Sequence, residues 1–495
     1  GGAEVERIDT HAAMVFLAGN RAIKLKRAVW FPFLDFSTVD LRRLNCEREV
    51  ELNRRTAPDF YLGAVAVTRE AGGGLALGGE GEPVDWVVAM SRFDQDGLFD
   101  RMAERGTLSL DLMLELADEI ARFHREAEAV AAAGGAAGMR WVVDDNLEEL
   151  AAMDGVFDTA SLDDLASRSR AALDRLAELL DARRDGGLVR RCHGDLHLRN
   201  ICLVEGRPML FDCIEFNDDI ACVDVLYDLA FLLMDLDHRG RRDLANLVFN
   251  RYLARTGDTA GLAAMPLFLS CRAAVLAKVR AAAAVRQSDA KLAKAGRDEA
   301  RDYLRRALAD LDPVPPRLVA VGGEVGAGKS TLAHAIAPEL GAVPGAVVLR
   351  TDVLRKQLFD CDILERLPEE AYSGDATRRT YSRLIEECET ALRAGFSVVA
   401  DATFVGSRLQ RRIERVAADV PFTGIWLRAP LAVREARIAG RRRDASDATV
   451  ELARMMHDDT TAPKGWVELD AEPDVARLAE QALGRAGAGV AGRLR

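Results

Sequence analysis

The residues whose chemistry is clearest lie at positions 323–330, which read Gly-Glu-Val-Gly-Ala-Gly-Lys-Ser. The apolar run Leu318-Val-Ala-Val-Gly322 precedes them, so the pattern is that of a buried strand, a glycine-rich turn and a helix. Glycines let backbone N–H groups curl around an anion, and the helix N-terminus adds partial positive charge. The pattern predicts a site for a nucleoside triphosphate and Mg²⁺. Its contacting residues would be Gly323, Gly326, Gly328, Lys329, Ser330 and Thr331.

A second set of polar residues lies far upstream, in His193-Gly-Asp-Leu-His-Leu-Arg-Asn200 and Met209-Leu-Phe-Asp212. Asp195 precedes Asn200 by five positions, and Asp212 ends a later apolar segment. A carboxylate, an asparagine and a second carboxylate in this order are typical of a kinase catalytic loop and its metal-binding neighbour. We expect Asp195 to orient and deprotonate a substrate hydroxyl, and Asn200 and Asp212 to hold Mg²⁺.

The composition is that of a globular protein with several domains. A chain of 495 residues is long enough for about three ordinary domains, and 49% hydrophobic residues suffice to build their cores. The net charge of −12 argues against broad nucleic-acid binding, which needs a basic surface. The eight cysteines are scattered without a Cys-x-x-Cys pair, which favours reduced core residues over disulfides or a zinc site.

No membrane-spanning helix is expected. The best apolar candidate, residues 221–236, is interrupted by Asp224, Asp228 and Asp235. No signal peptide is recognisable at the start of the sequence, so we expect a cytoplasmic protein.

The order of predicted elements changes at a proline-rich segment. Before it, strands are expected within 14–26 and 84–90, a helix over 38–56, and mainly helices from residue 107 through an alanine-rich region at 262–311. Asp312-Pro-Val-Pro-Pro316 ends that region and marks a domain boundary. After it, apolar strands alternate with helices, which predicts an open parallel sheet. The strands are expected near 318–322, 346–350, 396–401 and 422–428.

These motifs resemble two families. Residues 10–235 look like the aminoglycoside phosphotransferase/choline kinase type of protein-kinase-like fold, and residues 317–470 look like P-loop small-molecule and polynucleotide kinases. Their combination resembles bacterial fusions of a phosphotransferase with an ATP-binding protein. The resemblance implies an α+β bilobal front part, an α/β P-loop rear part, and ATP and Mg²⁺ in both. The implied domains are an N-lobe (1–93), a mainly helical C-lobe (94–312), a linker (313–316) and a P-loop domain with an arginine-rich lid (317–495).

The resemblance also implies roles for further front residues. Lys24 would contact the α- and β-phosphates, and Lys26, two residues on and on the same strand face, is the alternative. Either Glu47 or Glu49 of the following helix would pair with this lysine. Met90 begins the segment where backbone groups of the interlobe hinge would hold adenine.

The acceptor of the front part is expected to be small. No activation loop or Ala-Pro-Glu segment follows Asp212, so a small hydroxylated molecule is favoured over a protein. Asp228 is expected to support the catalytic loop structurally.

In the rear part, charged residues follow the strands. Asp352 ends the second strand, where it would deprotonate an acceptor hydroxyl, and Arg355 would hold an anionic substrate group. Asp-x-x-Arg resembles the acceptor motif of polynucleotide kinases. Asp401 ends the third strand and would hold a Mg²⁺-bound water or a substrate hydroxyl. Arg437 and Arg441 are four apart, share a face if helical, and resemble lid arginines that neutralise the transferring phosphate.

Together these features predict a tandem ATP-dependent phosphotransferase. The front acceptor would be a sugar, an aminoglycoside-like compound or a nucleoside, and the rear acceptor a second compound or the same metabolite. Two alternatives stay open: one half is a non-catalytic nucleotide-binding regulator, or the rear half is a polynucleotide 5′-kinase. Small molecules are the expected partners, nucleic acid is an option only for the rear half, no membrane partner is expected, and the oligomeric state is open.

Overall fold

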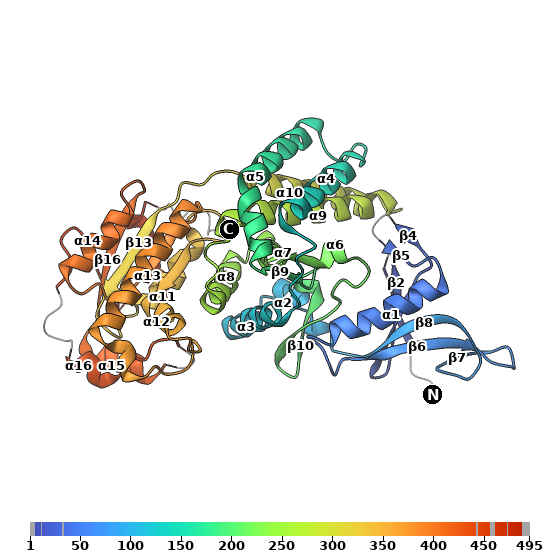
Figure 1. The fold of residues 1–495 in the computed structure, drawn as a ribbon, viewed down its shortest axis with the longest axis horizontal. Coiled ribbons are helices and arrows are strands. Elements are labelled where there is room, and N and C mark those ends of the chain that lie inside the picture. The colour runs from blue at the N-terminus through green and yellow to red at the C-terminus, as the bar shows by residue number, and fades with distance from the viewer. Residues whose placement is uncertain are drawn as a thin grey trace. The chain divides into compact units, whose positions relative to one another are not determined.

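The protein forms two compact units in a computed structural model (Figure 1). The structure describes residues 5–10, 12–31, 34–441, 444–455, 461–472 and 474–487. The first unit comprises Gly1–Asp235 and Cys271–Arg301, and the second comprises Leu236–Ser270 and Asp302–Arg495. The segment 236–270, which the sequence assigned to the C-lobe at 94–312, therefore packs with the P-loop region.

The first unit begins with a six-stranded antiparallel sheet in the order β1-β2-β3-β8-β6-β7. Helix α1 (Val39–Asn53) packs on this sheet through Cys46 and Val50. Thr38 caps the helix by accepting a hydrogen bond from the N–H of Leu41. The strands are β1 (Val5–Asp9), β2 (Ala13–Ala18), β3 (Arg21–Lys26), β6 (Tyr61–Arg69), β7 (Leu75–Leu77) and β8 (Glu82–Ser91), with a separate small hairpin of β4 (Trp30–Phe31) and β5 (Leu34–Asp35).

The rest of the first unit is mainly helical. Two short antiparallel strand pairs within it flank the loops 192–200 and 211–217, which carry the predicted catalytic and metal-binding residues. One pair is β9 (Val189–Arg191) with β12 (Cys222–Asp224), and the other is the hairpin of β10 (Ile201–Val204) and β11 (Arg207–Leu210). The longer helices that lie wholly in this unit are α3 (Leu110–Glu126), α4 (Gly135–Ala151) and α5 (Thr159–Asp185), and those that lie partly in it are α7 (Val225–His238), α9 (Met265–Arg286) and α10 (Ala290–Asp310).

Helix α9 corrects one expectation from the sequence. Residues 262–286 are long and apolar enough to cross a membrane by length and composition, whereas the sequence had singled out residues 221–236. However, 67% of the apolar window is buried inside the protein, as in the core helix of a soluble protein. Alanines give this segment its apolar character and also let it pack closely, so we interpret it as a core helix.

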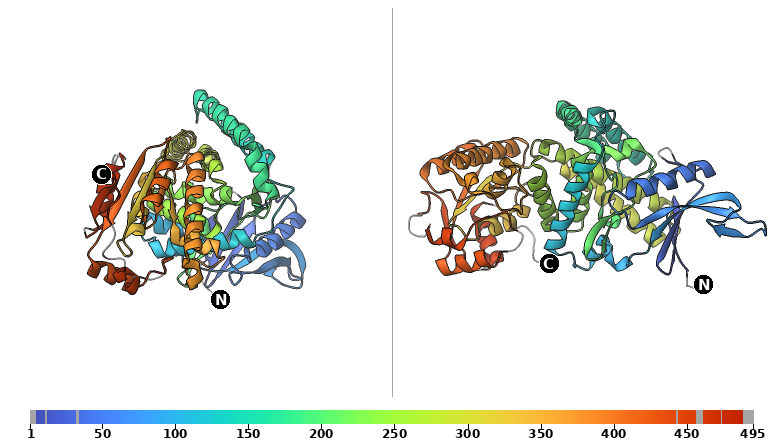
Figure 2. Two further views of the ribbon diagram at one scale, coloured as in Figure 1. Left: turned by 60° about the vertical axis from the view of Figure 1, so that its left-hand side comes forward. Right: turned by 60° about the horizontal axis from the view of Figure 1, so that its bottom comes forward.

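The second unit contains a five-stranded parallel sheet in the order β14-β15-β13-β16-β17. Helices stand on both sides of the sheet, as the predicted α/β pattern requires (Figures 1 and 2). The strands are β13 (Leu318–Gly323), β14 (Val347–Arg350), β15 (Val398–Asp401), β16 (Phe422–Arg428) and β17 (Val467–Asp470). The main helices are α8 (Arg242–Thr256), α11 (Lys329–Ile336), α12 (Thr351–Leu358), α13 (Gly374–Arg393), α14 (Ser407–Val416), α15 (Leu431–Ala439) and α17 (Val475–Arg485).

The core beneath the P-loop gives a first prediction. Leu332 of α11 is fully buried among Val319, Val321 and Leu478. We expect Leu332→Ala to lower the free energy of unfolding by about 3 kcal/mol, because it removes buried methyl groups and leaves a cavity. Urea unfolding followed through Trp426 and Trp466, which lie in this unit, measures the change.

The control is Leu364→Ala, since Leu364 is 38% exposed. A loss of less than about 1 kcal/mol for Leu332→Ala would contradict the described core.

Candidate active sites

In the first unit, a buried acidic residue joins two lysines of strand β3. Glu49 of α1 accepts hydrogen bonds from Lys24 Nζ at 2.9 Å through Oε1, and from Lys26 Nζ at 2.5 Å through Oε2. Lys24 also reaches Asp212 Oδ1 at 2.5 Å, whereas Lys26 pairs with Glu215. Lys26 is only 2% exposed. The structure therefore places Lys24 beside the predicted metal ligand and makes Lys26 an internal counter-ion.

Glu49, and not Glu47, is the partner of these lysines. Glu47 lies on the exposed side of α1 and pairs with Arg43 at 2.9 Å. Cys46, Glu49 and Val50 recur at helical spacing and form the buried face of α1. This apolar spacing around Glu49 is a signal in the sequence that could have separated the two candidates.

The charges of this cluster support each other. Burial alone would lower the pKa of Lys24, but Asp212 and Glu49 hold it well above its ordinary value. Burial alone would raise the pKa of Glu49, but Lys24 and Lys26 lower it to about 2. Lys24, Lys26 and Glu49 therefore all remain charged at neutral pH.

The catalytic loop is held by side-chain hydrogen bonds. Asn200 Nδ2 donates to Asp195 Oδ2 at 2.8 Å and to the Asp195 carbonyl at 2.9 Å. Asp228 accepts from the backbone N–H groups of His193 at 3.1 Å and Gly194 at 2.8 Å, so it has the supporting role predicted for it. Burial opposes ionisation of Asp195, but His197, with Nε2 at 3.3 Å, lowers the pKa of Asp195 below its ordinary value. Asp195 is therefore an ionised carboxylate.

Asp212 adopts an unusual backbone conformation. Its φ of +60° lies in the left-handed region, which residues other than glycine rarely adopt outside turns and functional sites. Its N–H donates to the Tyr61 hydroxyl at 3.0 Å, which stabilises this conformation. Because the Asn200 amide nitrogen is used by Asp195, its oxygen is left for a cation. The carboxylate of Asp212 and the amide oxygen of Asn200 are ligand types that Mg²⁺ prefers.

Met90 lies inside strand β8, opposite Ala22, and its side chain is buried in the sheet core. The chain leaves this strand after Ser91. A nucleotide contact at Met90 remains a prediction.

In the second unit, the glycine-rich turn has the backbone of an anion cradle. Gly323, Gly326 and Gly328 have φ values of +135°, +84° and +96°. A Cβ atom at Gly323 would lie 2.4 Å from the Leu427 carbonyl oxygen, so this position also needs glycine for space. Lys329 Nζ donates to the Glu324 carbonyl at 2.9 Å across the turn, and burial lowers the pKa of Lys329.

Asp401 lies beside the start of α11. Its Oδ2 accepts a hydrogen bond from Ser330 Oγ at 2.6 Å, and Arg350 Nε lies 3.4 Å from the same carboxylate. A serine hydroxyl and a carboxylate in contact fit the oxygen ligands and water contacts of Mg²⁺. Of the two roles predicted for Asp401, this contact favours the one beside the metal.

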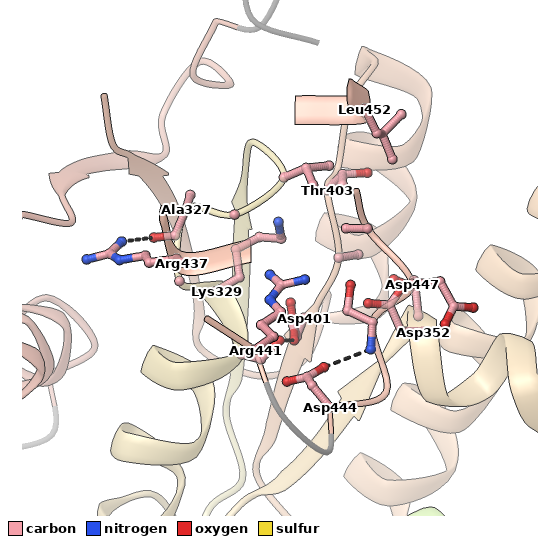
Figure 3. A pocket seen from close by; sticks show the side chains of 18 of the residues that line it. Ala327, Lys329, Asp352, Asp401, Thr403, Arg437, Arg441, Asp444, Asp447 and Leu452 are labelled. Carbon is pink, nitrogen blue, oxygen red and sulfur yellow. Dashed lines mark hydrogen bonds between the residues drawn. The ribbon is translucent and has the colours of Figure 1, made fainter. Parts of the chain in front are cut away.

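A cavity of about 950 Å³ brings most predicted rear residues together (Figure 3). Thr331 is at its exposed rim, and Gly323 is not among the lining residues. The predicted residues that line the cavity are Gly326, Gly328, Lys329, Ser330, Thr331, Asp352, Arg355, Asp401, Arg437 and Arg441.

The two arginines of the predicted lid differ. Arg437 donates to the carbonyls of Ala327 at 3.1 Å and Ala471 at 2.6 Å, so it braces the P-loop. Arg441 points toward the cavity, and its buried Nη1 has no hydrogen-bond partner among the described residues (Figure 3). Helix α15 ends at Ala439, so the expectation that both arginines share a helical face is wrong. Arg441 lies two residues beyond the end of this helix.

Asp352 and Arg355 both lie in α12, directly after β14. Burial raises the pKa of Asp352, while Arg350 and the Ser446 hydroxyl oppose the shift. Arg355 donates to the Ala371 carbonyl at 2.6 Å and is 7% exposed. The guanidinium of Arg355 thus holds the segment that follows α12 at Ala371. A contact of Arg355 with a substrate remains a prediction.

Sequence reasoning missed several residues of this site. Arg350 bridges Asp401 and Asp444, with Nη2 at 2.8 Å from Asp444 Oδ1. Its position as the last residue of a strand at the carboxyl edge of the sheet was a usable signal. Asp447 accepts from the Tyr372 hydroxyl at 2.7 Å, but no local pattern marks this long-range pair.

The contacts of Glu49 with Lys24 and Lys26 in the first unit give a second prediction. We expect Glu49→Ala to destabilise this unit by about 3–5 kcal/mol, because it leaves two buried lysines without their shared partner. Glu47→Ala is the matched control on the exposed side of the same helix and should leave the stability nearly unchanged. Thermal unfolding by calorimetry measures both, and equal effects would contradict the described orientation of α1.

The lid arginines give a third prediction. Arg441→Ala should weaken binding of a fluorescent ATP analogue to the second unit about tenfold without changing its unfolding temperature, because it removes an available guanidinium. Arg437→Ala should lower the unfolding temperature, because two carbonyls lose their donor. Titration of the analogue in a Lys24→Ala background measures the affinity, and calorimetry measures the unfolding temperature. Together they separate the role of Arg441 from that of Arg437. Loss of stability in Arg441→Ala would overturn this distinction.

Two family models match separate parts of the chain. A family model described as "Phosphotransferase enzyme family" matches residues 89–268, and one described as "AAA domain" matches residues 318–463. These matches and the parallel rear sheet confirm the fold class expected from the sequence: a protein-kinase-like front part and a P-loop kinase-like rear part.

Two solved structures cover one part each. A choline/ethanolamine kinase family protein from Mesorhizobium loti is 14% identical and covers 62% of this chain and 92% of its own, with a TM-score of 0.39. A sugar kinase from Janibacter sp. HTCC2649 is 20% identical and covers 35% of this chain and 96% of its own, with a TM-score of 0.29.

An uncharacterized protein of Mycobacterium tuberculosis spans both parts. It is 34% identical over 460 residues, which cover 90% of this chain and 88% of the relative. The chain therefore belongs to the same family as this mycobacterial protein, a family that joins a phosphotransferase-type kinase region to a P-loop kinase-like domain.

Proposed function

We propose that the protein is a tandem ATP-dependent phosphotransferase with one ATP·Mg²⁺ site in each unit. The observation that carries the proposal is that each unit has its own complete set of groups. The first unit has a paired lysine, an ionised carboxylate and two oxygen ligands, in Lys24, Asp195, Asn200 and Asp212. The second unit has an anion cradle, a hydroxyl–carboxylate pair and a carboxylate at the strand ends, in Lys329, Ser330, Asp401 and Asp352.

At the front site, Asp195 would accept the proton of the acceptor hydroxyl as that oxygen attacks the γ-phosphate. Its ionised form is suited to this role, and Asn200 orients it. Lys24 would turn from Asp212 to the phosphates. Mg²⁺, held by Asn200 and Asp212, would neutralise phosphate charge.

At the rear site, Asp352 would take the corresponding proton. Burial raises its pKa, which makes its carboxylate a stronger base than an exposed aspartate. Lys329 and Arg441 would balance the negative charge on the transferring phosphate, with Mg²⁺ beside Ser330 and Asp401.

The charges around Asp352 favour a small acceptor over a polynucleotide. The described residues that line the cavity include as many acids as bases: Asp352, Glu369, Asp401, Asp444 and Asp447 against Lys329, Arg355, Arg366, Arg437 and Arg441. Such a balanced lining does not favour a polyanionic chain, which needs a positively charged groove. We therefore propose a small hydroxylated acceptor for each site. The eight free cysteines, seven of them buried, suit a reducing cytoplasmic location.

A fourth prediction tests the independence of the two sites in the full chain. Lys329→Ala should reduce rear transfer on the order of 10³-fold, because it removes the cation at the β- and γ-phosphates. Front transfer should stay within about threefold of wild type, because each unit has its own catalytic groups. Asp195→Ala should do the converse, with a loss of at least about 10²-fold at the front site. Transfer of labelled γ-phosphate to panels of sugars, nucleosides, aminoglycosides and oligonucleotides measures both.

Several results would count against the proposal. If Lys329→Ala abolishes both activities in a folded protein, the sites are not independent. If one site binds nucleotide but never turns over, that half is a regulator. If only oligonucleotides accept phosphate in the Asp195→Ala variant, the rear half is a polynucleotide kinase.

A further inference from the structure

Strand β14 is an edge strand of the P-loop sheet. It pairs with β15 on one side, and no further strand follows it in the sheet order. An edge strand leaves alternate backbone N–H and C=O groups without a partner, and such groups are costly when buried. On the side of β14 away from β15, these groups include the N–H of Val348 and, just before the strand, the C=O of Ala346.

Helix α8 supplies the missing partner through a side-chain amide. Asn250 Oδ1 accepts from the Val348 N–H at 2.7 Å, and Asn250 Nδ2 donates to the Ala346 carbonyl at 3.1 Å. A residue of a neighbouring parallel strand makes the same two bonds, to the carbonyl before and the N–H after its opposite residue. One amide group thus replaces a strand residue, because Asn carries a donor and an acceptor on one rigid group, as a backbone residue does.

A second amide supports the first. Asn246, one turn earlier in α8, also donates to the Ala346 carbonyl, at 3.1 Å, and its own Oδ1 accepts from Asn250 Nδ2 at 3.0 Å. Asn246 and Asn250 are 1% and 4% exposed. Buried amides in such a network hold a fixed geometry, because any shift leaves a polar group unsatisfied.

The same helix also holds α12, which carries Asp352 and Arg355. The Ala254 carbonyl accepts from Gln357 Nε2 at 2.9 Å, near the end of α12. Arg255 forms an ion pair with Asp362, just beyond that helix. Helix α8 therefore contacts β14 before Asp352 and α12 after it, within one compact unit.

We propose that Asn250, supported by Asn246, is a positioning residue of the P-loop site: it fixes the exit of β14 and so the placement of Asp352. The P-loop itself leaves strand β13, which is two strands away in the sheet order. The role of Asp352 rests on the proposed function, whereas the amide contact does not. Helix α8, which carries both amides, lies upstream of the proline-rich segment.

The fifth prediction concerns Asn250→Leu in the full chain, a change that keeps the side-chain size and removes the amide. Hydrogen–deuterium exchange in residues 346–358 should become at least about tenfold faster, while exchange in residues 323–336 stays unchanged. Affinity of the second unit for a fluorescent ATP analogue, in a Lys24→Ala background, should stay within about threefold. With an acceptor identified for the rear site, the KM for that acceptor should rise about tenfold and the KM for ATP should not.

Asn146→Leu is the matched control. Asn146 is 3% exposed and donates to the Cys271 carbonyl at 3.2 Å, but it lies in the first unit. It should leave exchange in residues 346–358 and the rear acceptor KM unchanged.

Three outcomes would overturn the inference. Unchanged exchange in residues 346–358 of Asn250→Leu would show that the amide does not hold the edge. Equal acceleration in residues 323–336 would show a general loss of stability. Faster exchange at the edge with an unchanged acceptor KM would remove the positioning role. If the wild-type protein transfers phosphate to no acceptor, the proposed function fails, while the exchange result still decides the contact.

Discussion

Both units depend on the same constraint: a carboxylate inside the protein must have a cation or a hydrogen-bond donor beside it. Glu49 meets it with two lysines, and Asp401 meets it with Ser330 and Arg350. A buried carboxylate without such a partner is costly, and for Glu49 it is the two lysines that overcome the effect of burial and lower its pKa. The partners come from different elements in each case, so the constraint also fixes how strands and helices pack around each site.

Local motifs made a large part of both sites predictable. The P-loop glycines and the Asp195–Asn200 spacing act through neighbouring backbone, and their residue types largely dictate the conformation. The parallel sheet followed from apolar segments alternating with helices. By contrast, the choice between Glu47 and Glu49 depends on which side of α1 faces the sheet. The expectation that Arg437 and Arg441 share a helical face was wrong, because α15 ends at Ala439.

The extent of the rear unit was the least predictable feature. The prolines at 313–316 are a strong local signal, yet the segment 236–270 packs with the sheet that follows them. Its decisive contacts join Asn250 to Val348, almost a hundred residues later. An asparagine on a helix is ordinarily a surface residue, and only the tertiary fold shows that this one faces a strand edge. Contacts of this kind leave no periodic pattern in a sequence.

The two phosphate-contacting lysines differ in what a phosphate must displace. Lys24 is held by the carboxylates of Asp212 and Glu49, whereas Lys329 donates to the neutral carbonyl of Glu324. The contacts of Lys24 are ion pairs, so they carry an attraction between full charges that a hydrogen bond to a neutral carbonyl lacks. A phosphate at Lys24 therefore competes with a strong partner, and its binding gains most when Mg²⁺ occupies Asp212 at the same time. At Lys329 the competitor is weak and the backbone cradle is already formed, so the rear site should depend less on Mg²⁺ for nucleotide affinity than the front site does.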